Sequence, residues 1–128
     1  MSLRSPMGRV LGLGAAKEGV GHWWSQRVTS VALVIFGLWF VSALLRLDDF
    51  SYPIVIAWIA KPVNSVLLIL LVATAVYHSK LGVQVVVEDY VEHHGGKIVT
   101  MLLLNFVHVA LGALGIFAIL KIAFGAGA

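Results

Sequence analysis

The stretch Val28–Leu45, with the sequence VTSVALVIFGLWFVSALL, decides the fold of this chain. It contains no charged residue and is bounded by Arg27 and Arg46. A bilayer core about 30 Å thick is crossed by about 20 apolar residues in a helix that rises 1.5 Å per residue. We therefore expect this stretch to be a transmembrane helix.

Two further apolar windows follow it. The second window begins near Pro62, which suits a first helical turn because proline lacks the N–H that would be unpaired there. We place this span at about 63–87 and note that it contains His78. The third span, at about 98–120, contains His108. The sequence thus predicts an all-α membrane protein with three transmembrane helices.

The connections between these spans also carry signals. Residues 47–60 are too few to cross a bilayer, and Tyr52 and Trp58 favour the headgroup region, so we expect a short interfacial helix between the first and second spans. Between the second and third spans, His93 to Gly96 predicts a turn because paired glycines usually stop a helix.

Composition supports a membrane protein and excludes several other classes. Of the 128 residues, 60% are hydrophobic and only 12% are charged, against about 25% charged in ordinary soluble domains. A soluble enzyme or a nucleic-acid binder is therefore not expected, despite the formal net charge of +3. The chain has no cysteine, which excludes disulfides, thiolate metal sites and a cysteine nucleophile.

The distribution of basic residues predicts the orientation. Residues 1–27 form a basic segment that lacks the apolar core of a cleavable secretory signal, and residues 28–128 form the three-helix domain. Basic residues gather on the cytoplasmic side of membrane proteins, so we expect a cytoplasmic N-terminus and a periplasmic C-terminus. The residues expected on the cytoplasmic side are Arg4, Arg9, Lys17, Arg27 and Lys97, against Arg46, Lys61 and Lys121 on the other side.

Ionisable residues inside a membrane are costly and often functional. His78 lies about 13 Å from the end of the second span, and its imidazole could ligate haem iron through one nitrogen while the other donates a hydrogen bond. A hydrogen bond between packed helices is the plain alternative. His108 lies at a similar depth, so a self-contained electron carrier with His78 and His108 as the two haem ligands is also open.

Two polar groups are expected at the cytoplasmic ends of the helices. Asp89 and Tyr90 could bind a quinone head, since a phenol donates a hydrogen bond to a carbonyl and a carboxylate passes on a proton. The alternative is that Tyr90 belongs to the aromatic belt at the membrane interface and that Asp89 only marks the end of the helix. Before the first span, Trp23 and Trp24 suit an interfacial anchor, while Arg27 either snorkels to headgroups or pairs with a haem propionate or quinone.

The segment His78–Val91, HSKLGVQVVVEDYV, resembles the second-helix signature of the hydrophobic membrane-anchor subunits of succinate dehydrogenase, which is respiratory complex II. The resemblance rests on a histidine, a Gly-x-Gln-Val run and the later Asp-Tyr-Val. The entry into the first helix, Trp23–Leu33, is also similar to this family. The resemblance covers residues 21–91; His108 is not part of the pattern.

The resemblance implies a function for each matched residue. His78 would be one axial ligand of haem b, which would be shared with a second membrane subunit of the cytochrome b type. Tyr90 would hydrogen-bond ubiquinone with Asp89 beside it, and Arg27 and His22 would lie near the haem propionates and the quinone head.

The same resemblance implies partners and a location. The chain would tether the flavoprotein and iron–sulfur subunits to a bacterial inner membrane and would take part in electron transport without carrying out succinate chemistry itself. A fumarate reductase membrane anchor is the related alternative.

Overall fold

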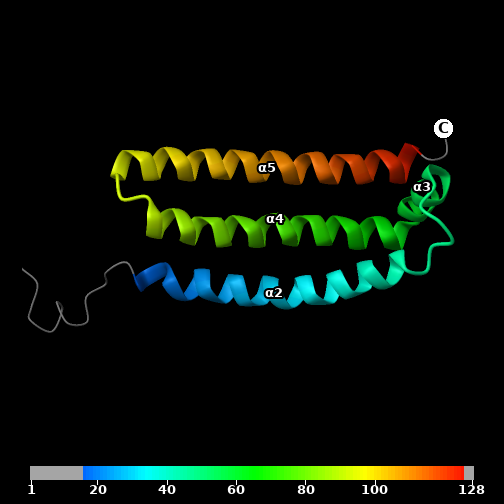
Figure 1. Ribbon diagram of the computed structural model, residues 1–128, viewed down its shortest axis with the longest axis horizontal. Coiled ribbons are helices and arrows are strands. Elements are labelled where there is room, and N and C mark those ends of the chain that lie inside the picture. The colour runs from blue at the N-terminus through cyan, green and yellow to red at the C-terminus, as the bar shows by residue number, and fades with distance from the viewer. Residues whose placement is uncertain (1–15, 126–128) are drawn as a thin grey trace, which may run out of the picture.

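The computed structural model describes residues 16–125, with side chains from Val20 onward. These residues form four α-helices, which are α2 (Ala16–Leu44), α3 (Tyr52–Ala60), α4 (Pro62–Tyr90) and α5 (His94–Gly125) (Figure 1). Helices α2, α4 and α5 are long and apolar enough to cross a membrane. The predicted all-α membrane fold, with three spans and a short helix after the first, is confirmed.

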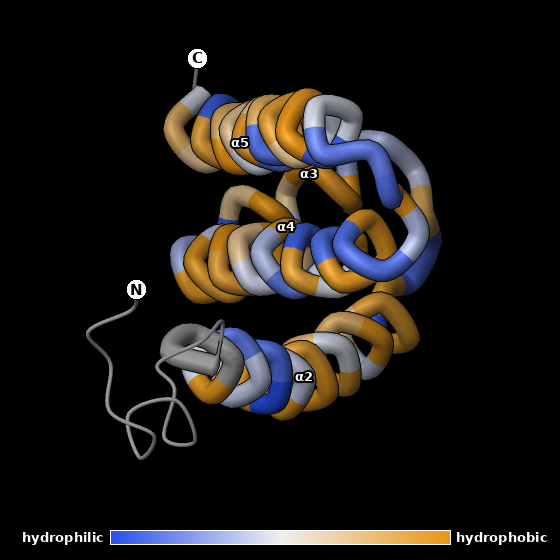
Figure 2. Tube along the Cα trace, turned by 90° about the vertical axis from the view of Figure 1, so that its left-hand side faces the viewer, coloured by the Kyte–Doolittle hydropathy of each residue, from blue (hydrophilic) through white to orange (hydrophobic). Residues whose placement is uncertain are grey.

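Helix α4 lies between the other two long helices. Figures 1 and 2 show α5, α4 and α2 side by side, and over the described residues the backbones of α2 and α5 do not approach each other within 8 Å between Cα atoms. Few side chains are buried in such an arrangement: five hydrophobic residues in the described part of the chain. Most apolar side chains therefore face outward, as expected of helices that meet lipid or another membrane subunit.

Helix α3 closes one end of the bundle through aromatic packing. Its buried Trp58 stacks on Trp39 of α2, with ring centroids 6.0 Å apart, and contacts Phe40 at 6.3 Å. Leu68 of α4 and Ile119 of α5 complete this buried cluster. All four helices are thus joined at this end by apolar contacts.

Side chains in the first turn of α4 donate hydrogen bonds to the last carbonyl groups of α3. Asn64 Nδ2 donates to the carbonyl oxygen of Trp58 at 2.7 Å, and the Ser65 hydroxyl donates to the carbonyl oxygen of Ile59. The last carbonyls of a helix have no partner within that helix. These side chains therefore hold α3 against α4, which begins at Pro62 as the sequence predicts.

The turn before α5 differs from the prediction. The connection is residues 91–93, and Gly95 and Gly96 belong to the first turn of α5, so the prediction of a turn extending to Gly96 is wrong. The reason is that His93 caps the helix. Its Nδ1 accepts from the Gly96 N–H at 3.3 Å, and its carbonyl oxygen accepts from the Lys97 N–H at 2.9 Å.

Helix α2 begins at Ala16, before the apolar window that starts at Val28, so the polar stretch 22–27 forms part of the same helix. Arg4, Arg9 and the Lys17 side chain, which carry most of the predicted charge bias, lie outside the described residues. The orientation in the membrane stays a prediction.

Candidate functional site

His78 lies on the side of α4 that packs against α2, and its side chain is half-buried. Two side chains of α2 approach the ring. Thr29 Oγ1 lies 2.9 Å from Nδ1, and Gln26 Nε2 lies 3.5 Å from Nε2. The candidate iron ligand therefore faces another helix of this chain and not open lipid.

The hydrogen bonds of Thr29 indicate which ring nitrogen of His78 carries the proton. The hydroxyl has one hydrogen, and its shortest contact is the carbonyl oxygen of Ser25 at 2.7 Å, which can only accept. The hydroxyl oxygen is then free to accept the Nδ1–H of His78. The Nε2 of His78 then carries no hydrogen. Its lone pair is approached only by Gln26 Nε2, at a distance near the limit of a hydrogen bond.

Among the described residues, two buried polar atoms of α2 lack hydrogen-bond partners, and one of them belongs to Gln26, which contacts this lone pair. Gln26 Oε1 and His22 Nε2 are both buried and make no hydrogen bond within the described part of the chain. His22, Gln26 and Thr29 lie on one face of α2, since they are spaced four and three residues apart. Buried atoms of this kind are characteristic of places where a ligand, a water molecule or another subunit supplies the partner.

Gly82 makes room for this polar face. It lies one turn after His78 on α4, and a Cβ built on it would stand 3.8 Å from Gln26 Nε2. This is an ordinary van der Waals distance, so a methyl group would fit against the Gln26 amide and only a side chain larger than alanine would displace it. The glycine of the Gly-x-Gln run thus lies against the polar face of α2, whereas Gln84 donates to Glu88 within α4.

His108 lies at the same depth as His78, as the spacing predicts, but it faces a different interface. It is buried in α5, where its Nδ1 lies 2.8 Å from the carbonyl oxygen of Leu104 and its Nε2 lies 3.3 Å from Ser79 Oγ. Because His78 turns to α2 and Ser79 turns to α5, the two histidines are not brought together. Both nitrogens of His108 already have partners, which does not favour the two-histidine haem alternative.

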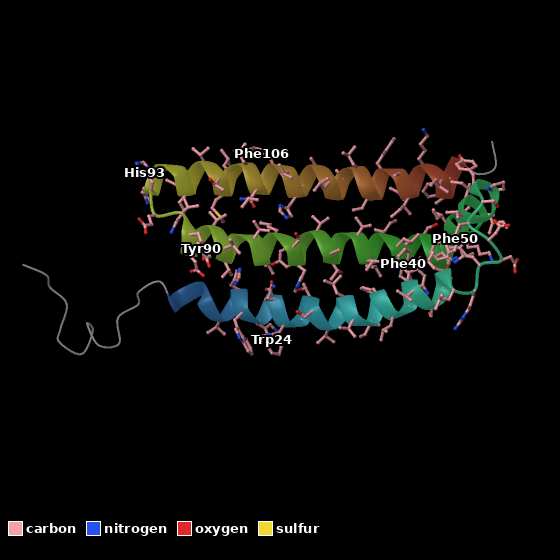
Figure 3. All side chains as sticks on the ribbon, in the orientation of Figure 1. Trp24, Phe40, Phe50, Tyr90, His93 and Phe106 are labelled. Atoms are coloured by element: carbon pink, nitrogen blue, oxygen red, sulfur yellow. The ribbon has the colours of Figure 1, made fainter. Side chains whose placement is uncertain are left out.

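Asp89 and Tyr90 occupy the last turn of α4, and both are exposed. The Tyr90 side chain is 82% exposed, and Figure 3 shows it at the same end of the bundle as His93. Neither side chain makes a hydrogen bond within the described part of the chain. Lys97 Nζ donates to the carbonyl oxygen of Glu88 at 2.8 Å, so the first turn of α5 holds this end of α4.

Arg27 lies on α2 one residue after Gln26 and is exposed. Its guanidinium carbon lies 5.4 Å from the centre of the Trp23 ring, a cation–π contact. Trp23 in turn stacks on Trp24, which points away from α4 in Figure 3. Arg27 is therefore joined to the aromatic pair, whereas His22 Nε2 is buried without a hydrogen-bond partner among the described residues.

Sequence reasoning missed two residues of the site, Gln26 and Thr29. The signal that could have found them is the polar face at positions 22, 26 and 29, which recurs at helical spacing. Among the described residues, no three or more His, Asp or Glu side chains gather in a way that could hold a metal ion by themselves. A metal bound at His78 would need ligands from elsewhere.

The family described as succinate dehydrogenase/fumarate reductase transmembrane subunit matches residues 1–114. Among individual relatives, the succinate dehydrogenase hydrophobic membrane anchor subunit of Rickettsia bellii is 40% identical over 78 residues, which are 61% of this chain and 62% of that protein.

Two further relatives carry similar names. The succinate dehydrogenase hydrophobic membrane anchor subunit of Rickettsia conorii is 38% identical over 82 residues, which are 63% of this chain and 65% of that protein. The succinate dehydrogenase membrane anchor subunit of Reclinomonas americana is 27% identical over 96 residues, which are 73% of this chain and 80% of that protein. The chain thus matches less than two thirds of the length of the two Rickettsia proteins.

Proposed function

The chain belongs to the succinate dehydrogenase/fumarate reductase transmembrane subunit family, and on that premise we propose that it anchors a succinate:quinone oxidoreductase in the membrane. In this proposal it contributes one ligand to a haem b shared with a second membrane subunit and part of a ubiquinone site. It also tethers the flavoprotein and iron–sulfur subunits, which carry out the succinate chemistry.

The observation that carries the proposal is the state of the His78 ring. An iron ligand needs an unprotonated nitrogen, and a hydrogen bond from the other nitrogen fixes the tautomer and the ring orientation. With the Thr29 hydroxyl donating to the Ser25 carbonyl oxygen, its oxygen accepts the Nδ1–H of His78 at 2.9 Å and leaves the Nε2 lone pair for a ligand. The residues present therefore fit a haem, which when bound would supply a one-electron store between the iron–sulfur clusters and the quinone.

The polar face of α2 fits the same group. Gln26 Oε1 and His22 Nε2 are buried on this face of α2 and lack partners in the described part of the chain. In the proposal the Gln26 amide turns away from the lone pair of His78, to which it makes only the long contact. His22 and Gln26 then hydrogen-bond to polar groups at the edge of the porphyrin or to the second membrane subunit.

Tyr90 and Asp89 serve the quinone. They lie about 18 Å along α4 from His78, at 1.5 Å per residue, at an end where both side chains are exposed. The Tyr90 hydroxyl donates to a quinone carbonyl oxygen, and Asp89 passes protons from water. Reduction to the quinol takes up two electrons and two protons, so an exposed carboxylate at this end suits the reaction.

This end of the bundle faces the soluble subunits in the proposal. Electrons leave the iron–sulfur clusters on the side where the quinone head is bound, so Tyr90, His93 and the beginning of α2 lie on the cytoplasmic side of a bacterial inner membrane. The opposite end, with α3 and the C-terminus of α5, is then periplasmic.

The haem proposal is tested by replacing each histidine in the complete complex. His78→Ala should abolish the low-spin signal in the reduced-minus-oxidised spectrum. His108→Gln, the matched control, should retain it because His108 has no free nitrogen to give to iron. Loss of the signal in the control and its persistence in His78→Ala would refute the assignment.

The quinone proposal is tested with Tyr90→Phe. Loss of one hydrogen bond to a neutral acceptor, worth about 0.5–1.5 kcal/mol, should raise the KM for ubiquinone by roughly two- to tenfold. Succinate oxidation with a soluble artificial acceptor should be unchanged. An equal fall in both activities would indicate defective assembly and contradict a role for Tyr90 in the quinone site.

A further inference from the structure

His108 has no part in the proposed function, yet it is the buried ionisable side chain of α5, with only 8% of its surface exposed. A polar ring inside a membrane helix is costly unless its hydrogen bonds are made. Its Nδ1 lies 2.8 Å from the carbonyl oxygen of Leu104, one turn earlier in α5, and its Nε2 lies 3.3 Å from Ser79 Oγ on α4. One residue therefore joins two helices.

The donors and acceptors of this group are fixed by its chemistry. A carbonyl oxygen only accepts, so the Nδ1 of His108 carries the proton and donates to Leu104. In a neutral imidazole the Nε2 then accepts, and Ser79 donates its hydroxyl hydrogen to it. Both ring nitrogens are thereby used, which leaves a structural role for the side chain.

The contacts that continue from His108 define the register of α4 and α5. Gly112 faces Val76, with an added Cβ 3.6 Å from Val76 Cγ1, and Gly115 faces Val72, with an added Cβ 3.0 Å from Val72 Cγ1. Small residues at such positions let two membrane helices approach closely. The two helices run antiparallel, so each step up α5 is matched by a similar step back along α4 (Figure 1).

The glycine and valine contacts favour the observed register, because a displacement of one turn would set Ile116 against Val76 in place of Gly112. The bond between His108 and Ser79 favours the same register, since a displaced α5 would break it and leave the buried His108 ring without its partner on α4. A single polar contact of this kind is a known means of fixing helix register.

The register matters because Ser79 directly follows His78. Successive residues of a helix differ in direction by about 100°, so turning Ser79 to α5 turns His78 to α2, where Thr29 accepts from its ring. We propose that His108 is a positioning residue: through Ser79 it sets the rotation and register of α4 and so aims His78. The effect on His78 rests on the proposed haem function. The link that His108 and Ser79 make between α5 and α4, called the clamp below, does not depend on it.

The clamp is tested by disulfide cross-linking in the complete complex. The chain has no cysteine of its own, so pairs introduced into it report only on their own distance. The pair Val76→Cys with Gly112→Cys reports on the observed register, in which a Cβ at position 112 stands 3.6 Å from Val76 Cγ1. The pair Val76→Cys with Ile116→Cys reports on a displacement of one turn. Mass spectrometry of the cross-linked peptides gives the ratio of the two products.

We expect His108→Leu to lower the ratio of native to displaced cross-links by about threefold and at most about twentyfold, the range typical of one hydrogen bond between membrane helices. Ser79→Ala should act in the same direction. His108→Gln, whose amide oxygen can accept from Ser79, should restore the ratio. Ser42→Ala is the matched control, because the Ser42 hydroxyl donates within its own helix to Trp39.

A second readout follows the aim of His78. In the same complexes, His108→Leu should shift the electron paramagnetic resonance signal and the midpoint potential of the low-spin haem, and His108→Gln should return both toward the wild-type values. An unchanged cross-linking ratio would overturn the clamp. A lowered ratio with an unchanged haem signal would overturn the positioning of His78.

The two proposals fail in different ways. A wild-type complex with no haem signal would overturn the haem function and the aim that depends on it, whereas the cross-linking ratio would still decide whether His108 fixes the register.

Discussion

Replacing Thr29 by valine should weaken haem binding by about tenfold. The two side chains have nearly the same shape, so the substitution removes the acceptor of the His78 Nδ1–H together with the hydroxyl bond to the Ser25 carbonyl oxygen within α2. The bond is 2.9 Å long, within the normal range for N–H···O hydrogen bonds. An unpaired donor costs about 1–3 kcal/mol when buried, and the lower half of this range applies because His78 is half-buried.

A cost of about 1–2 kcal/mol corresponds to roughly five- to thirtyfold in an equilibrium constant. Removing a side chain that orients a metal-ligating histidine typically costs about 10- to 100-fold in metal affinity, and the two ranges overlap from about tenfold to thirtyfold, of which the lower end is expected for a half-buried ring. The assay is the rate at which haem leaves the purified complex and enters excess apomyoglobin, followed by absorbance. Faster loss from Thr29→Val is the expected result.

Two substitutions control for the change of side chain. Thr29→Ser keeps the hydroxyl and should lose haem at nearly the wild-type rate. Ser30→Ala removes a hydroxyl that donates only to the Gln26 carbonyl oxygen within α2, at 2.7 Å, and should also have little effect. If Thr29→Val releases haem no faster than Ser30→Ala, then Thr29 does not fix the His78 tautomer, and the contact between Thr29 and His78 no longer supports haem ligation by His78.

Three further predictions concern packing and the ends of the helices. Gly115→Ala should lower the melting temperature of the complex, because its added Cβ would stand 3.0 Å from Val72 Cγ1. Strain of about 1–3 kcal/mol from this contact exceeds the gain of up to about 1 kcal/mol in helix propensity. Gly37→Ala, whose Cβ would have no atom within 4 Å, should not lower the melting temperature. Lys97→Met should raise amide hydrogen exchange of Val91 by roughly two- to fivefold, since the cation that binds the Glu88 carbonyl at the α4 terminus is lost; unchanged exchange would contradict this capping role. The Ser51 hydroxyl and N–H hold the pKa of Asp49 below its ordinary value, so these bonds are present above the unfolded-state pKa and are lost as the pH falls through the folded-state pKa. Carboxyl NMR titration of Ser51→Ala should show the Asp49 pKa moving upward, and no movement would exclude Ser51 as the cause.

The spans could be predicted from the sequence because a run such as Val28–Leu45 has only one stable environment. The beginning of α4 at Pro62 could be predicted for a similarly local reason. The ends of the helices are harder to predict. The change in hydropathy at Val28 marks the beginning of the apolar span, whereas α2 itself continues through polar residues back to Ala16. At α5 the paired glycines suggest a stop, but capping by His93 outweighs the weak helix preference of glycine in a first turn.

The contacts of His78 could not be predicted, because the long helices are apolar on most sides and carry no stripe that identifies the face turned to a neighbour. The depth of a side chain in the membrane follows from counting residues along its helix. His78 and His108 are therefore expected at the same depth. Rotation depends on side chains from other helices, here Thr29 for His78 and Ser79 for His108. Only the polar spacing of His22, Gln26 and Thr29 offers a clue, and it becomes meaningful once α2 is known to include them.

The α3 end of this bundle is held by aromatic packing and by the hydrogen bonds of Asn64 and Ser65, whereas the middle of α4, around His78, is held by hydrogen bonds between side chains. The difference follows from the membrane. Lipid chains are as apolar as leucine, so helices in a bilayer gain little from hydrophobic burial and associate through close packing and hydrogen bonds. At the α3 end, stacked Trp39 and Trp58 fill space but tolerate small rotations. Near His78, directional bonds to Thr29 and from Ser79 to His108 tolerate much less. A chain with so few polar side chains has placed several of them where the direction of one imidazole decides the chemistry.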